Sequence, residues 1–260
     1  MAKTSNPLDR FELASAEEKP RLVGLSIGDV GARKTSFWLG GPGPVVVQTL
    51  DQGLEGVVGR YVRAGKEVRV ANYDLGYTTD EYTQELAVEA RDKFEADFEV
   101  AVKNCRTLIW DRESDMYDLF VYAEFGAKER ADQFSAAPPR DWDKLKGRIR
   151  RMIAIAKAHD VNFGIIQGLR DEWVSTINKK TGNKTSTKSG RKVSSGMEGI
   201  DALVHVCLDH VIEEDGSVSL KVGKARGPGA PEWQQKSLPY MEFAEFGMLL
   251  YPDSDASEWE

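Results

Sequence analysis

The stretch from Val23 to Phe37 constrains the fold and the chemistry of this chain more than any other segment. A short apolar run ends at Gly28, a turn follows, and Lys34 and Thr35 open a predicted helix. This layout is typical of the phosphate-binding loop G-x-x-x-x-G-K-[ST], in which backbone N–H groups surround phosphate, the lysine reaches the outer phosphates and the hydroxyl holds Mg²⁺. The predicted nucleotide-binding residues are Gly28, Asp29, Val30, Gly31, Ala32, Arg33, Lys34, Thr35 and Ser36.

One position departs from this pattern, because Arg33 stands where the motif has its last glycine. Glycine lets the backbone come close to phosphate, and a side chain crowds that approach. We therefore expect nucleotide binding with weak or absent hydrolysis. The alternative is an ordinary strand, turn and helix that carries a surface lysine.

Length and composition suit one large α/β domain or two small ones, and the lack of a convincing linker favours a single domain at 21–250. The 260 residues are 41% hydrophobic and 30% charged, and no apolar run approaches the roughly 20 residues of a membrane span, so we expect no membrane association. Residues 1–20 are polar and predict an arm rather than a targeting peptide, and 251–260 form an acidic tail. Cys105 and Cys207 form no C-x-x-C pair, which is typical of reduced thiols in a cytoplasmic protein.

Alternating strands and helices predict an α/β fold with a mostly parallel central sheet flanked by helices and a C-terminal β-hairpin. The helix after the capping box at 78–81 has Tyr82, Leu86, Ala90, Phe94 and Phe98 as its apolar stripe. The predicted strands are 22–27, 45–50, 67–71, 107–110 and 161–166, with hairpin strands 203–212 and 217–222. The other predicted helices are 34–39, 115–131 and 141–158.

Three predicted strands end in polar residues, and parallel strands bring their carboxyl ends to one edge of a sheet. Asp111 ends an apolar strand downstream of the loop, the pattern of a carboxylate that holds Mg²⁺ together with Thr35. Asp51 is the candidate base for an attacking water, with Glu55 or Glu113 as alternatives. Gln167 is uncharged, so its predicted role is to sense the state of the site.

The segment 176–192 is basic and has no acidic residue, although the whole chain has a net charge of −7. Such a polar segment predicts a mobile loop, and its positive charge favours a nucleic-acid backbone. A solubilising surface loop is the alternative. The candidate DNA-binding residues are Lys179, Lys180, Lys184, Lys188, Arg191 and Lys192.

The order of these features resembles the RecA-like P-loop ATPase core. Ile165 to Arg170 is similar to the apolar-Gln-x-apolar-Arg strand end of that family, and the segment 171–196 corresponds to its second DNA-binding loop, with 124–140 as the first. The resemblance implies that Lys224 and Arg226 act in trans on the nucleotide of a neighbouring subunit, as an arginine finger does. A flexible surface loop is the alternative for these two residues.

The compact length and Gly43-Pro44 before the second strand are similar to the short RecA-like ATPases of bacteriophages, which include single-strand annealing proteins. The resemblance implies ATP and Mg²⁺ as cofactors, single-stranded DNA and a single-strand-binding protein as partners, assembly into a ring or filament, and the cytoplasm of a bacterial host. Two other hypotheses stay open. One is a P-loop ATPase of another class, such as a packaging, partitioning or kinase protein, and the other is a nucleic-acid-binding module without hydrolysis.

Overall fold

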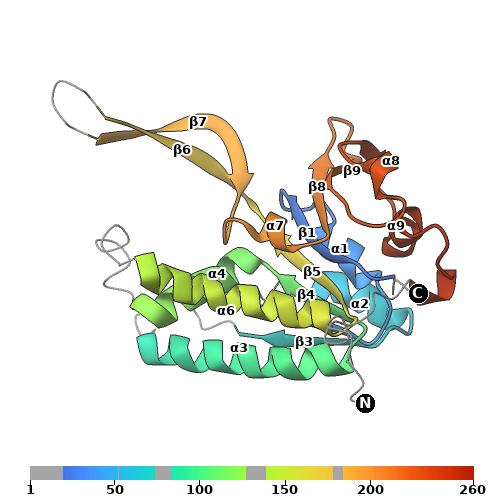
Figure 1. Ribbon diagram of the computed structural model, residues 1–260, viewed down its shortest axis with the longest axis horizontal. Helices are drawn as coiled ribbons and strands as arrows, with labels where there is room; N and C mark the ends of the chain where they lie inside the picture. Colours follow the sequence, from blue (N-terminus) through green and yellow to red (C-terminus); the bar gives the residue numbers. More distant parts are fainter. Residues whose placement is uncertain (1–19, 52, 74–82, 127–138, 178–183) are drawn as a thin grey trace, which may run out of the picture.

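The computed structural model describes residues 20–51, 53–73, 83–126, 139–177 and 184–260. Within these residues, the centre of the fold is an eight-stranded sheet with the strand order β10-β9-β8-β1-β5-β4-β2-β3 (Figure 1). The strands are β1 (Val23–Gly28), β2 (Val45–Thr49), β3 (Val68–Asn72), β4 (Thr107–Asp111), β5 (Asn162–Gln167), β8 (Val206–Ile212), β9 (Val218–Lys224) and β10 (Ser237–Pro239).

All neighbouring strands from β8 to β3 are parallel, whereas β9 and β10 are antiparallel additions at one side. The parallel strands β1, β4 and β5 are almost completely buried, which explains why they are continuous apolar runs rather than alternating ones. The predicted α/β class, the mostly parallel sheet with flanking helices and the hairpin β8–β9 are confirmed. Because β5 lies between β1 and β4, the ends of these three strands are adjacent.

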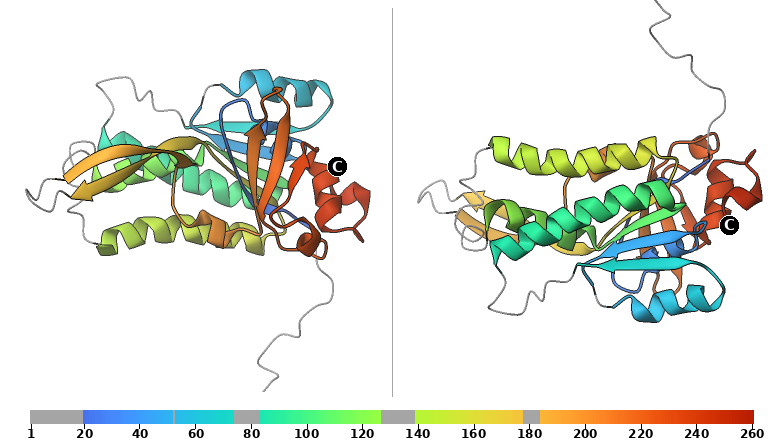
Figure 2. Two further views of the ribbon diagram at one scale, coloured as in Figure 1. Left: turned by 90° about the horizontal axis from the view of Figure 1, so that it is seen from above. Right: turned by 90° about the horizontal axis from the view of Figure 1, so that it is seen from below.

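Helices cover both faces of the sheet and form two cores (Figures 1 and 2). One core lies under α3, α4, α6 and α7 and contains Phe94, Phe98 and Ile149. The other lies under α1, α2, α8 and α9 and contains Phe37, Trp38 and Phe243. The helices are α1 (Lys34–Leu39), α2 (Glu55–Arg63), α3 (Gln84–Asn104), α4 (Glu113–Phe125), α6 (Pro139–Ala158), α7 (Ile200–Leu203), α8 (Ala230–Trp233) and α9 (Phe243–Leu250).

Trp38 of α1 packs directly against the sheet, and its position depends on two small residues. A Cβ on Gly164 of β5 would lie 2.2 Å from Trp38 Cδ2, so only glycine leaves room for the indole ring. The indole Nε1 donates a hydrogen bond to Ser26 Oγ at 2.9 Å. The helix that follows the loop is therefore fixed directly on β1 and β5.

The prediction of a mobile loop at 176–192 is wrong for the residues that the structure describes. The chain forms a long antiparallel ribbon of β6 (Leu169–Ile177) and β7 (Lys184–Ser194), which extends away from the sheet at the end of the molecule opposite α8 and α9 (Figures 1 and 2). Threonine, valine, isoleucine and tryptophan favour strands, and paired across a ribbon they outweigh the polar composition. Lys179 and Lys180 lie outside the described residues.

Several predicted boundaries also shift. The helix at 115–131 is α4, which stops at Gly126, a residue with φ 73°. Helix α3 begins at Gln84 with Thr83 as its N-cap, and Leu86 is 42% exposed, so Leu86 does not belong to the apolar stripe. The helix α2 was not predicted. Other predicted features lie outside the described residues: the capping box at 78–81, Tyr82, the arm at 1–19 and most of the first loop at 124–140.

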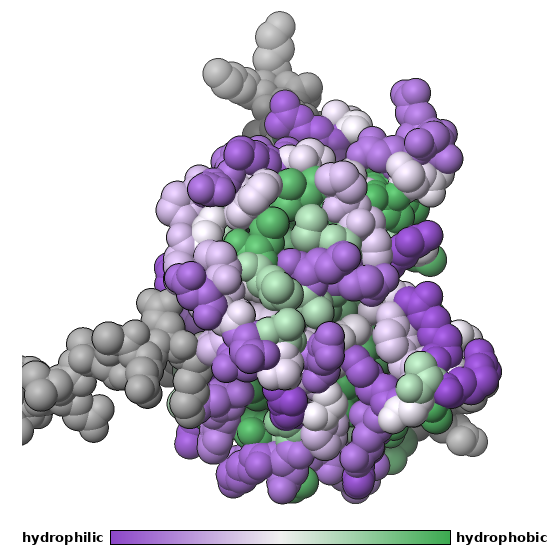
Figure 3. Space-filling model, turned by 90° about the vertical axis from the view of Figure 1, so that its right-hand side faces the viewer, coloured by the Kyte–Doolittle hydropathy of each residue, from purple (hydrophilic) through white to green (hydrophobic). Residues whose placement is uncertain are grey.

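The last residues pack onto the domain rather than extending from it. A short 3-10 helix (Ala256–Glu258) places Trp259 in the core with no exposed surface, and Trp259 packs directly on Gly247 of α9. Seen from this end of the molecule, hydrophobic residues gather in the middle of the face and hydrophilic ones surround them (Figure 3). The acidic segment 251–260 therefore completes the core around α9.

Candidate functional site

A pocket opens at the carboxyl edge of the parallel strands, where β1, β2, β4 and β5 end. The predicted loop, Asp51 and Asp111 all contribute to it, so the structure brings together residues that are far apart in the sequence. Gln167 lies between two lining residues, Ile166 and Gly168. The lining residues are Gly28, Asp29, Val30, Gly31, Lys34, Thr35, Asp51, Gly53, Leu54, Val57, Asp111, Arg112, Ser114, Ile166, Gly168, Leu169 and Ser195.

Thr35 and Asp111 form the contact that the sequence predicted for a metal site. Thr35 Oγ1 lies 3.2 and 3.3 Å from the two carboxylate oxygens of Asp111. Burial raises the pKa of Asp111 to about 6, and the hydrogen bond from Thr35 opposes part of that rise. A cation beside this pair would favour the ionised carboxylate.

Lys34 points back over the loop that precedes it. Its Nζ donates hydrogen bonds to the carbonyl oxygens of Gly28 and Asp29 at 2.8 and 2.7 Å. Burial lowers the pKa of Lys34, whereas the nearby carboxylates of Asp111 and Asp29 act in the opposite direction. The ammonium group is thus held at the mouth of the loop by weak neutral acceptors that an anionic group can replace.

Arg33 has left-handed backbone angles, φ 60° and ψ 20°, a conformation that glycine adopts without cost. Its guanidinium carbon lies 5.2 Å from the ring centroid of Tyr240, and Arg33 does not line the pocket. The arginine therefore keeps the backbone shape of the missing glycine while its side chain points to the β10 side of the domain. This geometry does not support the expectation that the Arg33 side chain crowds the phosphate site.

The loop rests on a buried histidine that the sequence analysis missed. His210 of β8 contacts the carbonyl oxygen of Ala32 at 3.1 Å and Ser26 Oγ at 3.0 Å through its two ring nitrogens. Burial lowers the pKa of His210 to about 3, so the ring is neutral near pH 7. Together with Trp38, which also bonds Ser26, it fixes the underside of the loop.

Asp51 lines the pocket, and its carboxylate already has two partners. Its carboxylate accepts a hydrogen bond from the backbone N–H of Gly53 at 2.9 Å and pairs with Arg112 at 3.2 Å. Arg112 also pairs with Asp115 at 2.8 Å. The structure thus adds a cation to the pocket wall, which the sequence analysis missed because an arginine after a strand has no motif of its own.

A buried hydrogen-bond relay of Gln167, Glu113 and Met197 lies between the pocket and the end of the ribbon. Gln167 Nε2 donates to Glu113 Oε2 at 2.7 Å, and Glu113 accepts a second hydrogen bond from the backbone N–H of Met197 at 3.3 Å. Glu113 has no exposed surface, and burial raises its pKa to about 8. This side chain faces Gln167 and not the pocket, so its geometry does not support the alternative role of base. The side chain of Glu55, the other alternative, lies outside the described residues.

Gly196 lets the backbone after the ribbon run close to the Glu113 carboxylate, because it has no side chain. It has φ +99°, and a Cβ there would lie 2.0 Å from Glu113 Oε2. The backbone N–H of Ser195 donates to the carbonyl oxygen of Gly168 at 2.9 Å, which closes the base of the ribbon. Lys192 Nζ contacts Asp29 Oδ1 in the predicted phosphate loop at 2.8 Å. The base of the ribbon is therefore joined to the pocket through Ser195 with Gly168 and through Lys192 with Asp29.

The basic residues of the ribbon are exposed where the structure describes them. Lys188, Arg191 and Lys192 lie on β7, and Lys184 begins that strand, although its side chain lies outside the described residues. The ribbon also carries carboxylates: Lys188 pairs with Asp171, and Ser189 Oγ donates to Glu172 at 2.6 Å. The excess of positive charge predicted for the loop is thus partly neutralised by residues of β6.

Lys224 and Arg226 do not reach the pocket of their own chain. In the antiparallel register of β8 and β9, Lys224 lies opposite Cys207, at the start of β8 and thus at the amino edge of the parallel strands. Its Nζ donates a hydrogen bond to the carbonyl oxygen of Asp201 at 2.6 Å. Arg21 and Lys157 lie nearby, and burial together with these cations lowers the pKa of His205 to about 4. A role for Lys224 and Arg226 at a nucleotide requires the nucleotide of another copy.

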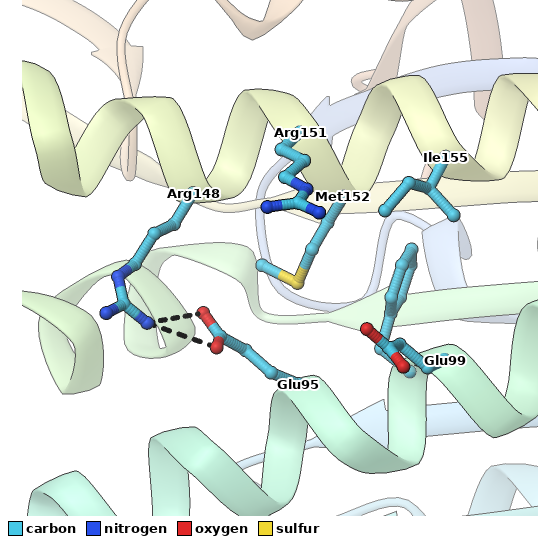
Figure 4. A pocket seen from close by; sticks show the side chains of 7 residues that line it. Glu95, Glu99, Arg148, Arg151, Met152 and Ile155 are labelled. Carbon is cyan, nitrogen blue, oxygen red and sulfur yellow. Dashed lines mark hydrogen bonds and ion pairs between the residues drawn. The ribbon is translucent and has the colours of Figure 1, made fainter.

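A second hollow lies between α3 and α6 (Figure 4). Arg148 of α6 reaches across it to both carboxylate oxygens of Glu95 at 3.2 and 3.1 Å, while Phe98 and Met152 form its floor. None of the predicted site residues lies here. We regard this hollow as part of the packing interface between α3 and α6, which the ion pair of Arg148 and Glu95 connects.

Within the described ranges, no group of three or more His, Cys, Asp or Glu side chains could hold a metal ion, and no helix is long and apolar enough to cross a membrane. Mg²⁺ does not need such a cluster, because it commonly keeps several waters and binds one carboxylate together with substrate phosphates. The donor set of Thr35 and Asp111 fits that mode of binding. The chain matches no protein-family model, and no curated protein is significantly similar to it in sequence.

Proposed function

We propose that this protein binds ATP and Mg²⁺ in the pocket at the carboxyl edge of the sheet and acts on single-stranded DNA, as a RecA-like P-loop ATPase of the short bacteriophage type does in strand annealing or recombination. The observation that carries the proposal is the contact between Thr35 and Asp111, 3.2 Å apart, beside the ammonium group of Lys34. A lysine and a hydroxyl after one strand, beside a carboxylate at the end of another, are the groups that hold a nucleoside triphosphate and its metal.

Each residue has a distinct role in this proposal. Lys34 binds the outer phosphates after leaving the loop carbonyls, and Thr35 and Asp111 hold Mg²⁺, which neutralises charge on the phosphates when bound. Asp51 accepts the proton of an attacking water, and Arg112 beside it keeps that carboxylate oriented. Gln167 senses the outer phosphate or the water and passes the change through Glu113 to the base of the ribbon.

The ribbon β6–β7 is the proposed DNA-binding element in place of the predicted mobile loop. Its base touches the pocket through Lys192 and Asp29, so occupancy of the phosphate site can change the direction of the ribbon. The opposite edges of the sheet support assembly: Asp29, Asp51 and Asp111 line the carboxyl edge, and Arg21, Lys157, Lys224 and Arg226 gather at the amino edge. Head-to-tail contact between these edges gives a ring or an open filament.

The test is nucleotide binding and ATP turnover, with and without single-stranded DNA, for the wild type and Lys34→Ala. The exposed lysine of α3 provides the matched control Lys103→Ala. We expect nucleotide binding by the wild type and the control, and a loss of at least about 100-fold in affinity or turnover for Lys34→Ala. Equal binding by all three proteins contradicts the proposed site.

The same assay separates the other hypotheses. Phosphotransfer that is independent of DNA favours a P-loop ATPase of another class. DNA binding that ignores ATP favours a module without hydrolysis. Turnover stimulated by DNA and lost in Lys34→Ala supports the RecA-like function and shows that Arg33 is compatible with hydrolysis.

A further inference from the structure

The ribbon β6–β7 carries a large aromatic side chain that the fold does not use. Trp173 of β6 is 59% exposed, whereas Trp38, Trp110 and Trp259 are buried in the two cores. An indole in water on a projecting ribbon lacks the apolar burial that normally stabilises tryptophan, so its ring is available to a ligand.

The strand register shows which side chains share the face of Trp173. Trp173 pairs with Lys188, and Asp171 on the same face of β6 pairs with Lys192. Between these two pairs β7 holds three residues, Ser189 to Arg191, and β6 holds only Glu172, so β7 bulges outward. This face therefore presents one exposed indole ring opposite Lys188, with Asp171 and Lys192 as the neighbouring cross-strand pair.

Lys188 touches the ring itself. Its Nζ lies 5.5 Å from the ring centroid of Trp173, and the same ammonium group pairs with Asp171. A cation beside an exposed aromatic ring is the combination that binds unpaired nucleotides, because the ring stacks on a base and the cation attracts its phosphate. A protein partner would use a wider apolar surface than this single ring offers.

We infer that Trp173 is a stacking platform for one base of a single-stranded nucleic acid, with Lys188 as the cation for the adjoining phosphate. The inference rests on the proposed function, because the ligand is a nucleic acid. It adds that Trp173 is the residue that distinguishes a single strand from a duplex. Base pairs in a duplex hide the ring faces that Trp173 needs. The indole therefore selects unpaired strands, and Lys188 and Lys192 contribute charge without selecting.

The experiment is a titration of fluorescently labelled oligothymidine and of a labelled duplex with the full chain, over a series of salt concentrations. The variants are Trp173→Ala, Trp173→Phe and Lys188→Ala. The matched control is Val174→Ala, because Val174 is 45% exposed on the opposite face of the same strand. Thermal unfolding of each variant checks that the sheet is intact.

We expect Trp173→Ala to bind oligothymidine about tenfold more weakly with an unchanged salt slope. Trp173→Phe keeps most of the affinity, and Val174→Ala binds as the wild type does. Lys188→Ala lowers the salt slope by about 0.7, the value for one phosphate contact on a single strand. Duplex affinity is the same for Trp173→Ala and the wild type.

Equal affinity of the wild type and Trp173→Ala for oligothymidine overturns the inference and leaves the proposed function standing. An equal loss for single strand and duplex also overturns it, since a lost stack cannot weaken duplex binding. If the wild type binds oligothymidine through Trp173 but ignores ATP, the inference holds and the ATP-coupled function fails. Absence of any single-strand binding by the wild type overturns both.

Discussion

The pocket and the ribbon differ in what holds them. The pocket is formed by strand ends between two buried cores, and its side chains contact groups fixed by the sheet, such as His210 under the loop. The ribbon pairs only with itself, and two-stranded ribbons alone are marginally stable in water. Its direction depends on contacts at its base, above all the pair of Lys192 and Asp29. A site held between two cores and a ribbon held at its base thus meet at one edge of the sheet.

This comparison predicts that one change, a methyl group added to a glycine, costs far more stability in the sheet than in the ribbon. In the sheet, Gly164→Ala places a Cβ 2.2 Å from Trp38 and must move the indole or β5. We expect the free energy of unfolding to fall by about 3 kcal/mol or more, measured by urea denaturation. The matched control is Gly147→Ala in α6, where a Cβ meets open space and the helix gains about 0.5–1 kcal/mol. A loss below about 1 kcal/mol for Gly164→Ala means that the layer around Trp38 is not rigid.

The junction of the two regions gives the second prediction. The pKa of Glu113 is raised to about 8 by burial, so between its ordinary value and pH 8 the folded chain keeps a proton that the unfolded chain has lost. Stability therefore falls as pH rises through that range, by roughly 2 to 3 kcal/mol between about pH 5.5 and 7.5. Denaturation of wild type and Glu113→Gln over this range tests it.

We expect Glu113→Gln to flatten this slope, while the raised pKa of Asp111, about 6, leaves a smaller slope of the same sign at lower pH. The exposed turn residue Glu214 provides the control Glu214→Gln, whose profile follows the wild type. An unchanged slope in Glu113→Gln contradicts the raised pKa.

The third prediction concerns the loop. Arg33→Gly relieves the left-handed backbone by about 1–2 kcal/mol, but it loses the contact with Tyr240 and makes the unfolded chain more flexible. We expect a net change in unfolding free energy within about 1 kcal/mol and a change in nucleotide affinity below about threefold. Thermal unfolding and a nucleotide titration measure both. A tenfold change in affinity indicates that the arginine contacts the nucleotide.

The smallest effect belongs to the ribbon. Gly190 has φ +81° in the bulge of β7, and a Cβ there meets nothing within 4 Å. Gly190→Ala costs about 1 kcal/mol of local backbone strain. Because the ribbon opens without the sheet, the midpoint of unfolding stays the same, and hydrogen exchange becomes faster only in β6 and β7. Faster exchange throughout the parallel sheet would show that the two regions unfold together.

The sequence predicted the pocket better than the ribbon. Val45–Thr49 and Thr107–Asp111 are apolar runs that end in polar residues, a pattern that depends on local burial alone. The loop and its lysine, hydroxyl and carboxylate followed from spacing. The ribbon was predicted as coil because its composition is polar, and cross-strand pairs such as Ser175 with Ser186, 2.9 Å apart, have no signal along the chain.

By itself the sequence determined the strand-and-helix alternation, the position of the loop and the residues at the strand ends, since each of these follows from neighbouring residues. Only the tertiary structure decided that Gln167 bonds Glu113, that Lys192 meets Asp29 and that Trp259 closes the core. The first two contacts join residues that are 54 and 163 positions apart, and the third depends on packing against α9. Which distant groups meet is fixed by the order of strands in the sheet, and that order is a property of the whole packed chain.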